Sequence, residues 1–339
     1  MAYGSPRLRL AVLSAIGLFG AVMATGWWLN QPTGWGLVDV EIEAGLSARA
    51  IGAKLEQAGV VRSGRYFAYL ARYRGLAEEL EAGNYRLDRG YSTDQVLTNL
   101  LQAPLELIRV TVPEGLTRLE IAAVFQGTGM ADSARFVELS GDDALVAELG
   151  IAASSLEGYL FPETYFLPPD IEEEEIIRHM VSQFFEVFED SMFVRLDSIN
   201  LSLHEAVTLA SIVEREAMAQ EERPVIASIF HRRLALNRRL ESCATVEFSL
   251  GVHKKRLTNE DLRVQSSYNT YLHRGLPPGP IGSPGKASLD AALNPLQTDY
   301  LYFVARGDGT HQFSRTNRDH ELAKHAIRRQ ERRRQAGVK

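Results

Sequence analysis

The apolar and polar positions of this 339-residue chain begin with an uncharged run and continue as segments of alternating strand and helix periodicity. The run covers Leu10–Leu29, and as an α-helix it would extend about 30 Å, the hydrocarbon thickness of a bilayer. Arg7 and Arg9 precede it, and Trp27 and Trp28 stand at its far end. The pattern predicts a single-pass anchor in the cytoplasmic (inner) membrane. The N-terminus would lie in the cytoplasm and the rest of the chain outside, on the periplasmic side.

A cleaved signal peptide is the alternative reading of this run. The run is longer than the apolar part of most signal peptides, and no clean A-x-A site follows it. The anchor is therefore favoured. Residues 1–37 are assigned to a cytoplasmic tip, the anchor and a short polar spacer.

A repeat with a spacing of 70 residues follows the spacer. Val40–Leu46 (VEIEAGL) matches Val110–Leu116 (VTVPEGL), and the helix-like pattern after each copy ends at Gly59 and Gly129. Each copy predicts a strand, a glycine turn and an amphipathic helix. We therefore expect two related α+β units, one over residues 38–105 and one at about 106–170.

The remaining pattern is mostly helical. It predicts helices at 171–197, 203–219, 221–236 and 287–293, a hairpin from 299–305 and 311–314, and a last helix from about Arg318. The predicted fold class is α+β, comprising an N-terminal membrane helix, a small α+β module at 38–105 and a mixed α+β domain at 106–339.

Two glutamates stand at the end of an apolar helical segment, Leu209–Ala217 (LASIVEREA). Because successive helix residues turn by about 100°, the carboxylates of Glu214 and Glu216 point to nearly opposite faces. They cannot both reach one substrate bond. The pattern alone leaves open which of the two glutamates is catalytic. It also leaves open a structural role in which both pair with Arg or Lys.

Three further groups of polar and aromatic residues are typical of a carbohydrate cleft. Two carboxylates stand among four aromatic rings in 156–166, a composition that suits sugar hydroxyls and ring faces. The segment 267–271 precedes a loop at 275–285 that is rich in proline and glycine and could wall a cleft. A core strand with a turn, and a plain surface connection, are the structural alternatives. The candidate binding residues are Glu157, Tyr159, Glu163, Tyr268, Asn269, Thr270, Pro278 and His311.

Composition excludes several classes of function. A formal net charge of −6 argues against wholesale nucleic-acid binding, and the arginines of 328–334 suit a solvated helical tail. Cys243 is the single cysteine, so no intrachain disulfide can form. The eight histidines are scattered without an H-E-x-x-H motif, and no phosphate-binding loop is present. We expect neither a metal site nor a cofactor.

The motifs taken together resemble those of the endolytic murein transglycosylase family (MltG, YceG-like). The matching segments are EGYLFPETY (157–165), ASIVERE (210–216), ASIFHRRL (227–234), YNTY (268–271), GLPPGPI (275–281) and YLYFVA (300–305), with His311 and Phe313. The family pattern places its catalytic glutamate first in the E-[KR]-E triplet, which is Glu214 here. The resemblance also implies that residues 38–105 form a LysM-like glycan-binding module.

The resemblance implies a peptidoglycan lytic transglycosylase without a cofactor. It would cleave the β-1,4 bond between N-acetylmuramic acid (MurNAc) and N-acetylglucosamine (GlcNAc) in nascent glycan strands, leave a 1,6-anhydroMurNAc end, and terminate strand elongation. Glu214 would act as acid and then as base, with Glu157, Tyr268 and Asn269 holding the sugar. Cell-wall synthases would be its neighbours.

Two other functions stay open. One is a hydrolytic muramidase that uses Glu214 with a second carboxylate, Glu157 or Glu241. The other is a membrane-tethered scaffold that binds glycan strands without cleaving them.

Overall fold

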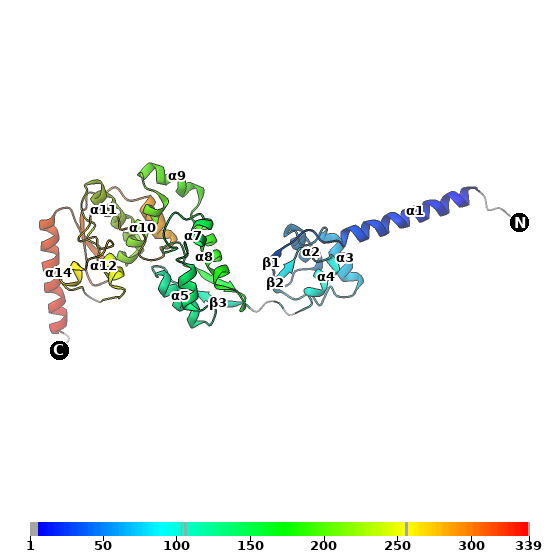
Figure 1. Cartoon of the computed structure of the whole chain (residues 1–339), viewed down its shortest axis with the longest axis horizontal. Helices are drawn as coiled ribbons and strands as arrows, with labels where there is room; N and C mark the ends of the chain where they lie inside the picture. The colour runs from blue at the N-terminus through cyan, green and yellow to red at the C-terminus, as the bar shows by residue number, and fades with distance from the viewer. Residues whose placement is uncertain (1–5, 103, 105–106, 255–256, 338–339) are drawn as a thin grey trace. The chain divides into compact units, whose positions relative to one another are not determined.

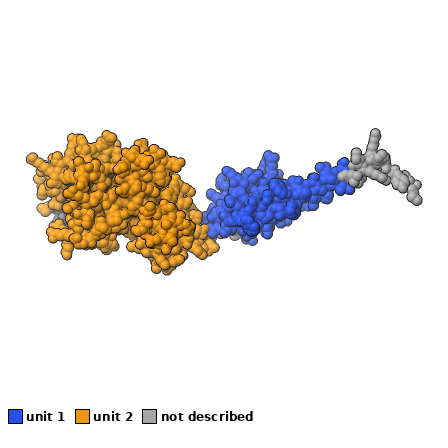
Figure 2. Space-filling view, turned by 45° about the horizontal axis from the view of Figure 1, so that its top comes forward, with its two compact units in different colours: residues 1–107 blue, residues 108–339 orange. Residues whose placement is uncertain are grey.

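The computed structural model describes residues 6–102, 104, 107–254 and 257–337, with the side chains of 6–13, 15, 331 and 333–337 outside that description. The chain divides into two compact units, Met1–Leu107 and Ile108–Lys339 (Figure 2). Figure 1 labels many of the helices and strands of both, among them α10 (Leu203–Glu216) and α14 (Asn317–Gly337) of the second unit. The described elements are mostly helical, with three two-stranded antiparallel sheets, so the predicted mixture of α and β structure is confirmed.

The first unit starts with α1 (Pro6–Leu29) and continues as a small α+β module. β1 (Leu37–Ile42) pairs with β2 (Gly83–Asp88), and α2 (Ala48–Gln57), α3 (Gly64–Tyr73) and α4 (Thr93–Asn99) complete the module. Its core is built from the apolar stripes of these elements, and its most buried side chains include Leu55, Phe67, Val96 and Leu97.

Close packing of α2 against α3 depends on two glycines. A Cβ on Gly52 would lie 2.3 Å from the carbonyl oxygen of Gly64, and a Cβ on Gly64 would lie 2.2 Å from that of Gly52. Both distances are far below van der Waals contact, so the absence of side chains allows the two backbones to touch.

The part of α1 whose side chains are described carries large apolar residues on its surface. Ile16, Leu18, Phe19, Val22 and Met23 are each at least 60% exposed. Among the described residues, no helix has both the length and the apolar character needed to span a membrane. Residues 10–13 and 15 of the predicted span lie outside the described side chains.

The second unit opens with the second copy of the predicted repeat. β3 (Ile108–Thr111) leads through a glycine turn into α5 (Arg118–Gly127), as β1 leads into α2, and Gly45 and Gly115 adopt φ values of +81° and +79°. α6 (Ser133–Leu139) and α7 (Asp143–Glu148) follow, and β4 (Thr164–Leu167) pairs with β3. The predicted strand–turn–helix order is therefore confirmed in both copies.

The rest of the second unit is a helical cluster with a terminal hairpin. Its elements are α8 (Glu173–Val187), α9 (Asp190–Ile199), α10 (Leu203–Glu216), η1 (Gln220–Glu222), α11 (Arg223–Ala235), α12 (Cys243–Leu250), η2 (Asp261–Arg263), α13 (Lys286–Leu293), β5 (Tyr302–Ala305), β6 (His311–Ser314) and α14 (Asn317–Gly337). α10 is central because it packs against α9, α11, α12 and α13.

One prediction about this region was wrong, and one helix was not predicted. The single helix expected over 171–197 is broken between α8 and α9, where Phe188 leaves helical geometry with ψ +75° and packs its ring between those of Phe184 and Phe193. Helix α12 was missed, because its sequence, CATVEFSL, is apolar on most sides and shows no clear helical period.

Candidate active site

Helix α10 holds both candidate acids at its C-terminal end. A capping box of Ser202 and Glu205 starts the helix, and each residue from Ala206 to Val213 is buried. The apolar sequence therefore fixes this helix inside the unit. Glu214 and Glu216 emerge where the helix ends, on different sides.

Glu214 lies in a salt bridge. Its Oε1 accepts a hydrogen bond from Nη2 of Arg223 at 2.8 Å, and its Oε2 accepts one from the backbone N–H of Gly285 at 3.1 Å. The side chains of Glu214 and Arg223 are 6% and 7% exposed. Both carboxyl oxygens of Glu214 therefore accept hydrogen bonds from fixed donors.

A second carboxyl group, that of Glu114, shares the same guanidinium. Its Oε2 lies 3.4 Å from Nη2 of Arg223. Burial and the adjacent charge of Glu214 raise the pKa of Glu114, and Arg223 opposes them. Glu114 was not among the residues predicted from the sequence. The repeat contained a signal for it, because the second copy has a glutamate where the first copy has Ala44.

Glu216 has different surroundings. Its Oε1 accepts hydrogen bonds from the Ser242 hydroxyl at 2.5 Å and from the Ala244 N–H at 3.4 Å. Burial raises the pKa of Glu216, whereas these two hydrogen bonds and the nearby His311 lower it. Within the described chain it forms no ion pair with lysine or arginine. This is the environment of a carboxyl group that can keep its proton at higher pH than a solvated glutamate.

Glu216 also lines a pocket of about 580 Å³. The pocket walls come from the end of α10, the start of α12, the β5–β6 hairpin and α14. Its other polar lining residues are Arg233, Glu241, Cys243, Tyr271, Tyr302, His311, Asn317, His320, Glu321 and Lys324. Of the predicted binding residues, His311 alone lines this pocket with Glu216, and Tyr271 directly follows the predicted Thr270.

Glu157 lies in a smaller pocket of about 290 Å³ with Arg215, Phe248 and His253. Its carboxyl group accepts hydrogen bonds from the Arg118 N–H, at the start of α5, at 3.1 and 3.3 Å. Burial raises the pKa of Glu157 to about 7, against the lowering effect of Arg118. Tyr268 lies near this region, its ring centroid 4.8 Å from that of Phe248.

Three predicted binding residues serve packing in this structure. Tyr159 is buried and contacts the Phe184 ring edge-on. Asn269 is fully buried and donates hydrogen bonds to the carbonyl oxygens of Leu262 and Val264. Thr270 is buried, and its hydroxyl accepts a hydrogen bond from the Ser242 N–H.

Two others lie at the surface. Glu163 is exposed and accepts a hydrogen bond from the Thr164 N–H at the start of β4. Pro278 is exposed, and its carbonyl oxygen lies 2.9 Å from Nε2 of His204.

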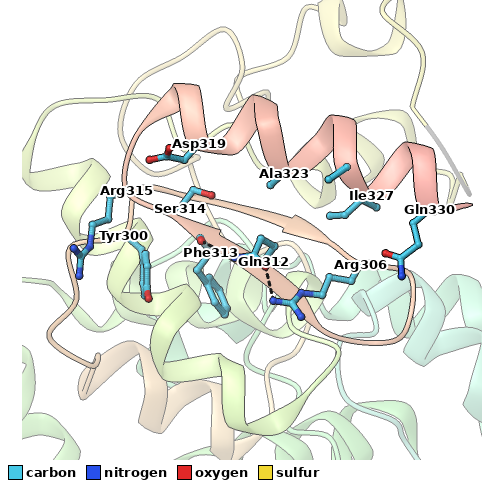
Figure 3. A pocket seen from close by; sticks show the side chains of 11 residues that line it. Tyr300, Arg306, Gln312, Phe313, Ser314, Arg315, Asp319, Ala323, Ile327 and Gln330 are labelled. Carbon is cyan, nitrogen blue, oxygen red and sulfur yellow. Dashed lines mark hydrogen bonds between the residues drawn. The ribbon is translucent and has the colours of Figure 1, made fainter.

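A further pocket of about 510 Å³ lies between β6 and α14 (Figure 3). The close-up shows Tyr300 and Phe313 below the helix and the hydrogen bond from Arg306 to Gln312. None of the predicted site residues lines it. Among the described residues, no group of three or more His, Cys, Asp or Glu side chains is placed to hold a metal ion.

Comparisons with known proteins point to one family. The model of the YceG-like family matches residues 40–326. An endolytic murein transglycosylase of Bacillus subtilis (strain 168) is 34% identical over 306 residues, covering 85% of this chain and 84% of that protein. One from Streptococcus pneumoniae serotype 2 is 30% identical, covering 92% of this chain and 62% of the longer relative.

A solved structure is also similar. A crystal structure of a YceG-like protein from Listeria monocytogenes is 34% identical and superposes with a TM-score of 0.60. The alignment covers 84% of this chain and 98% of that one.

Proposed function

Because this chain belongs to the YceG-like family, we propose that it is an endolytic murein transglycosylase that cleaves peptidoglycan glycan strands. The bond would be the β-1,4 linkage from MurNAc to GlcNAc in uncrosslinked, nascent strands, and the product a 1,6-anhydroMurNAc end. Family membership and the relatives' shared name support this reaction.

We further propose that Glu216 is the acid. The observation that carries this choice is the contrast between the two glutamates of α10. Glu214 is bound to Arg223 and lines none of the pockets described above, whereas Glu216 forms no ion pair with a described lysine or arginine and faces a pocket of about 580 Å³. A proton donor needs a proton and access to substrate. The family pattern favoured Glu214, and the experiment below separates the two residues.

In this mechanism the proton of Glu216 goes to the bridging oxygen, and GlcNAc leaves with that oxygen as a hydroxyl. The 6-hydroxyl of MurNAc then bonds to its own anomeric carbon, and its proton goes to a base. No water is consumed. The nucleophile is part of the substrate, so the second carboxylate of ordinary glycosidases is not needed. Holding the 6-hydroxyl near the anomeric carbon supplies much of the remaining acceleration.

A muramidase would need a second carboxylate to act on water or on the sugar. Of the two carboxylates considered for this role, Glu157 lies in another pocket, and Glu241 lines the pocket of Glu216 but is bound to Arg233 at 2.8 Å. The geometry therefore favours the anhydro product. Mass spectrometry separates the two reactions, since a hydrolysed end is heavier by one water.

We propose that α1 anchors the protein in the cytoplasmic membrane, with the second unit outside. The exposed apolar side chains of its described part and the charge-free sequence of Leu10–Leu29 support this placement. Residues 38–105 would be the LysM-like module that holds the strand, and cleavage near the membrane would end strand elongation beside the cell-wall synthases. Protease accessibility in spheroplasts tests the orientation, because an outside domain is digested without lysis.

The catalytic test uses full-length protein in detergent and purified uncrosslinked strands. The wild type should produce anhydro ends. Glu216→Gln should lower the rate by about 10²–10⁴-fold without changing the melting temperature, since it removes a proton donor. Glu214→Gln should mainly lower the melting temperature. A folded, inactive Glu214→Gln protein beside a fully active Glu216→Gln protein would reverse the assignment, and a wild type that binds without cleaving would indicate a scaffold.

A further inference from the structure

The pocket that contains Glu216 also contains a histidine with a dedicated carboxylate. Nδ1 of His311, the first residue of β6, lies 2.7 Å from Oε2 of Glu222 at the end of η1. The His311 backbone N–H donates to the same carboxylate at 3.0 and 3.1 Å. The two side chains are 4% and 16% exposed. Eighty-nine residues apart in sequence, they form a fixed pair.

The geometry of this pair decides how the imidazole is used. A carboxylate accepts hydrogen bonds, so Nδ1 carries a hydrogen and Nε2 is the nitrogen left to exchange a proton. Within the described residues, Nε2 of His311 forms no hydrogen bond. The Phe303 ring contacts the imidazole edge-on, with 5.4 Å between the two ring centroids, and this contact limits rotation of the imidazole.

His311 lies close enough to Glu216 to act on it electrostatically. Both side chains line the same pocket, one from the end of α10 and one from the hairpin. A glycan bond bound there would meet a carboxyl group and an imidazole. The proposed reaction has two proton transfers, one to the bridging oxygen and one from the 6-hydroxyl.

We propose that His311, oriented by Glu222, is the general base that takes the proton of the MurNAc 6-hydroxyl. This inference rests on the proposed function and adds a second catalytic residue to it. Glu216 gives its proton to the bridging oxygen as the bond from that oxygen to the anomeric carbon breaks. The 6-oxygen bonds to the anomeric carbon and loses its proton to Nε2. Afterwards Glu216 is a carboxylate and His311 an imidazolium, and one proton returned from the histidine to the glutamate restores both.

This division of roles differs from a single glutamate that acts first as acid and then as base. With two side chains, both groups are ready before the bond breaks. The Glu222 carboxylate would stabilise the imidazolium as it forms, and it fixes the ring meanwhile.

The test is chemical rescue of His311→Ala in full-length protein on purified strands. The rate of anhydro-end formation should fall by about 10²–10⁴-fold. Added imidazole should restore a large part of it, because the pocket has room for the lost ring. 1,2,4-Triazole, which has a similar shape and is a far weaker base, should not. His320→Ala is the matched control, since His320 lines the same pocket and its variant should gain nothing from imidazole.

Glu222→Gln provides a second measurement that does not depend on removing the imidazole. It should lower kcat with little change in KM for the strands, because the ring loses its orienting carboxylate while substrate contacts remain. A folded His311→Ala or Glu222→Gln protein with the wild-type rate would overturn the proposal, and so would equal rescue by imidazole and triazole. If the wild type makes no anhydro ends, or if Glu216→Gln is fully active, the proposed function has failed instead.

Discussion

Arg223, the first residue of α11, binds the carboxylate of Glu214 at the last turn of α10, with 2.8 Å between Nη2 and Oε1. The same arginine donates from Nε to the hydroxyl of Ser288 on α13 at 2.9 Å. One buried guanidinium therefore joins three helices around the end of the helix that carries Glu216. We assign this cluster to holding the site in place.

Arg223→Met should destabilise the protein strongly. Removing one partner of a buried ion pair leaves the other charge without compensation, which costs about 3–5 kcal/mol of unfolding free energy. Urea unfolding of the second unit measures it. Arg232→Met is the matched control, because the pair of Arg232 with Asp299 is 41% and 64% exposed and such pairs contribute about 0–1 kcal/mol. Equal losses of unfolding free energy in Arg223→Met and Arg232→Met would contradict the stabilising role of the buried pair.

Gly285→Ala should be destabilising because of Glu114. A Cβ at Gly285 would lie 1.8 Å from Oε1 of Glu114, so the Glu114 side chain must shift from its present position. Glu114→Ala removes the collision. In a double-mutant cycle we therefore expect Gly285→Ala to lower the free energy of unfolding by less in the Glu114→Ala background than in the wild type. If the two losses of unfolding free energy are strictly additive, the glycine is needed for a reason other than Glu114.

Much of the helical fold could be predicted because its causes are local. The apolar stripes and the capping box of Ser202 and Glu205 specify α10, and the repeat specifies the glycine turns at Gly45 and Gly115. The break at Phe188 could not be predicted, because it depends on rings from two helices packing around that residue.

Less of the candidate site could be predicted from the sequence. Helical periodicity predicted that Glu214 and Glu216 face different sides, and the structure shows different partners for each. Which side meets Arg223 and which meets a pocket depends on later segments. Likewise, the pairing of His311 with Glu222 joins residues 89 positions apart, which no local pattern reveals.

The stability of the protein should depend on pH through Glu157. Its pKa is raised from 4.5 to about 7, so between these values the folded state binds more protons than the unfolded state. Stability from this group therefore falls as pH rises from about 4.5 to 7, by about 3 kcal/mol. Glu157→Gln should flatten the curve of unfolding free energy against pH in this window. Glu163→Gln, at an exposed position, is the control and should leave the wild-type curve unchanged.

The pH dependence of strand cleavage should respond to Ser242. Activity requires protonated Glu216, so the rate should fall as pH rises through the pKa of that residue, which burial raises. The hydrogen bond from the Ser242 hydroxyl favours the carboxylate and lowers this pKa. Ser242→Ala removes it and should move the alkaline limb of the pH–rate profile to higher pH. Ser249→Ala, in the helix that follows Ser242, is the matched control, because the Ser249 hydroxyl donates to the Thr245 carbonyl. A limb that moves to lower pH in Ser242→Ala, or that moves equally in both variants, would exclude Glu216 as the group whose titration sets the rate.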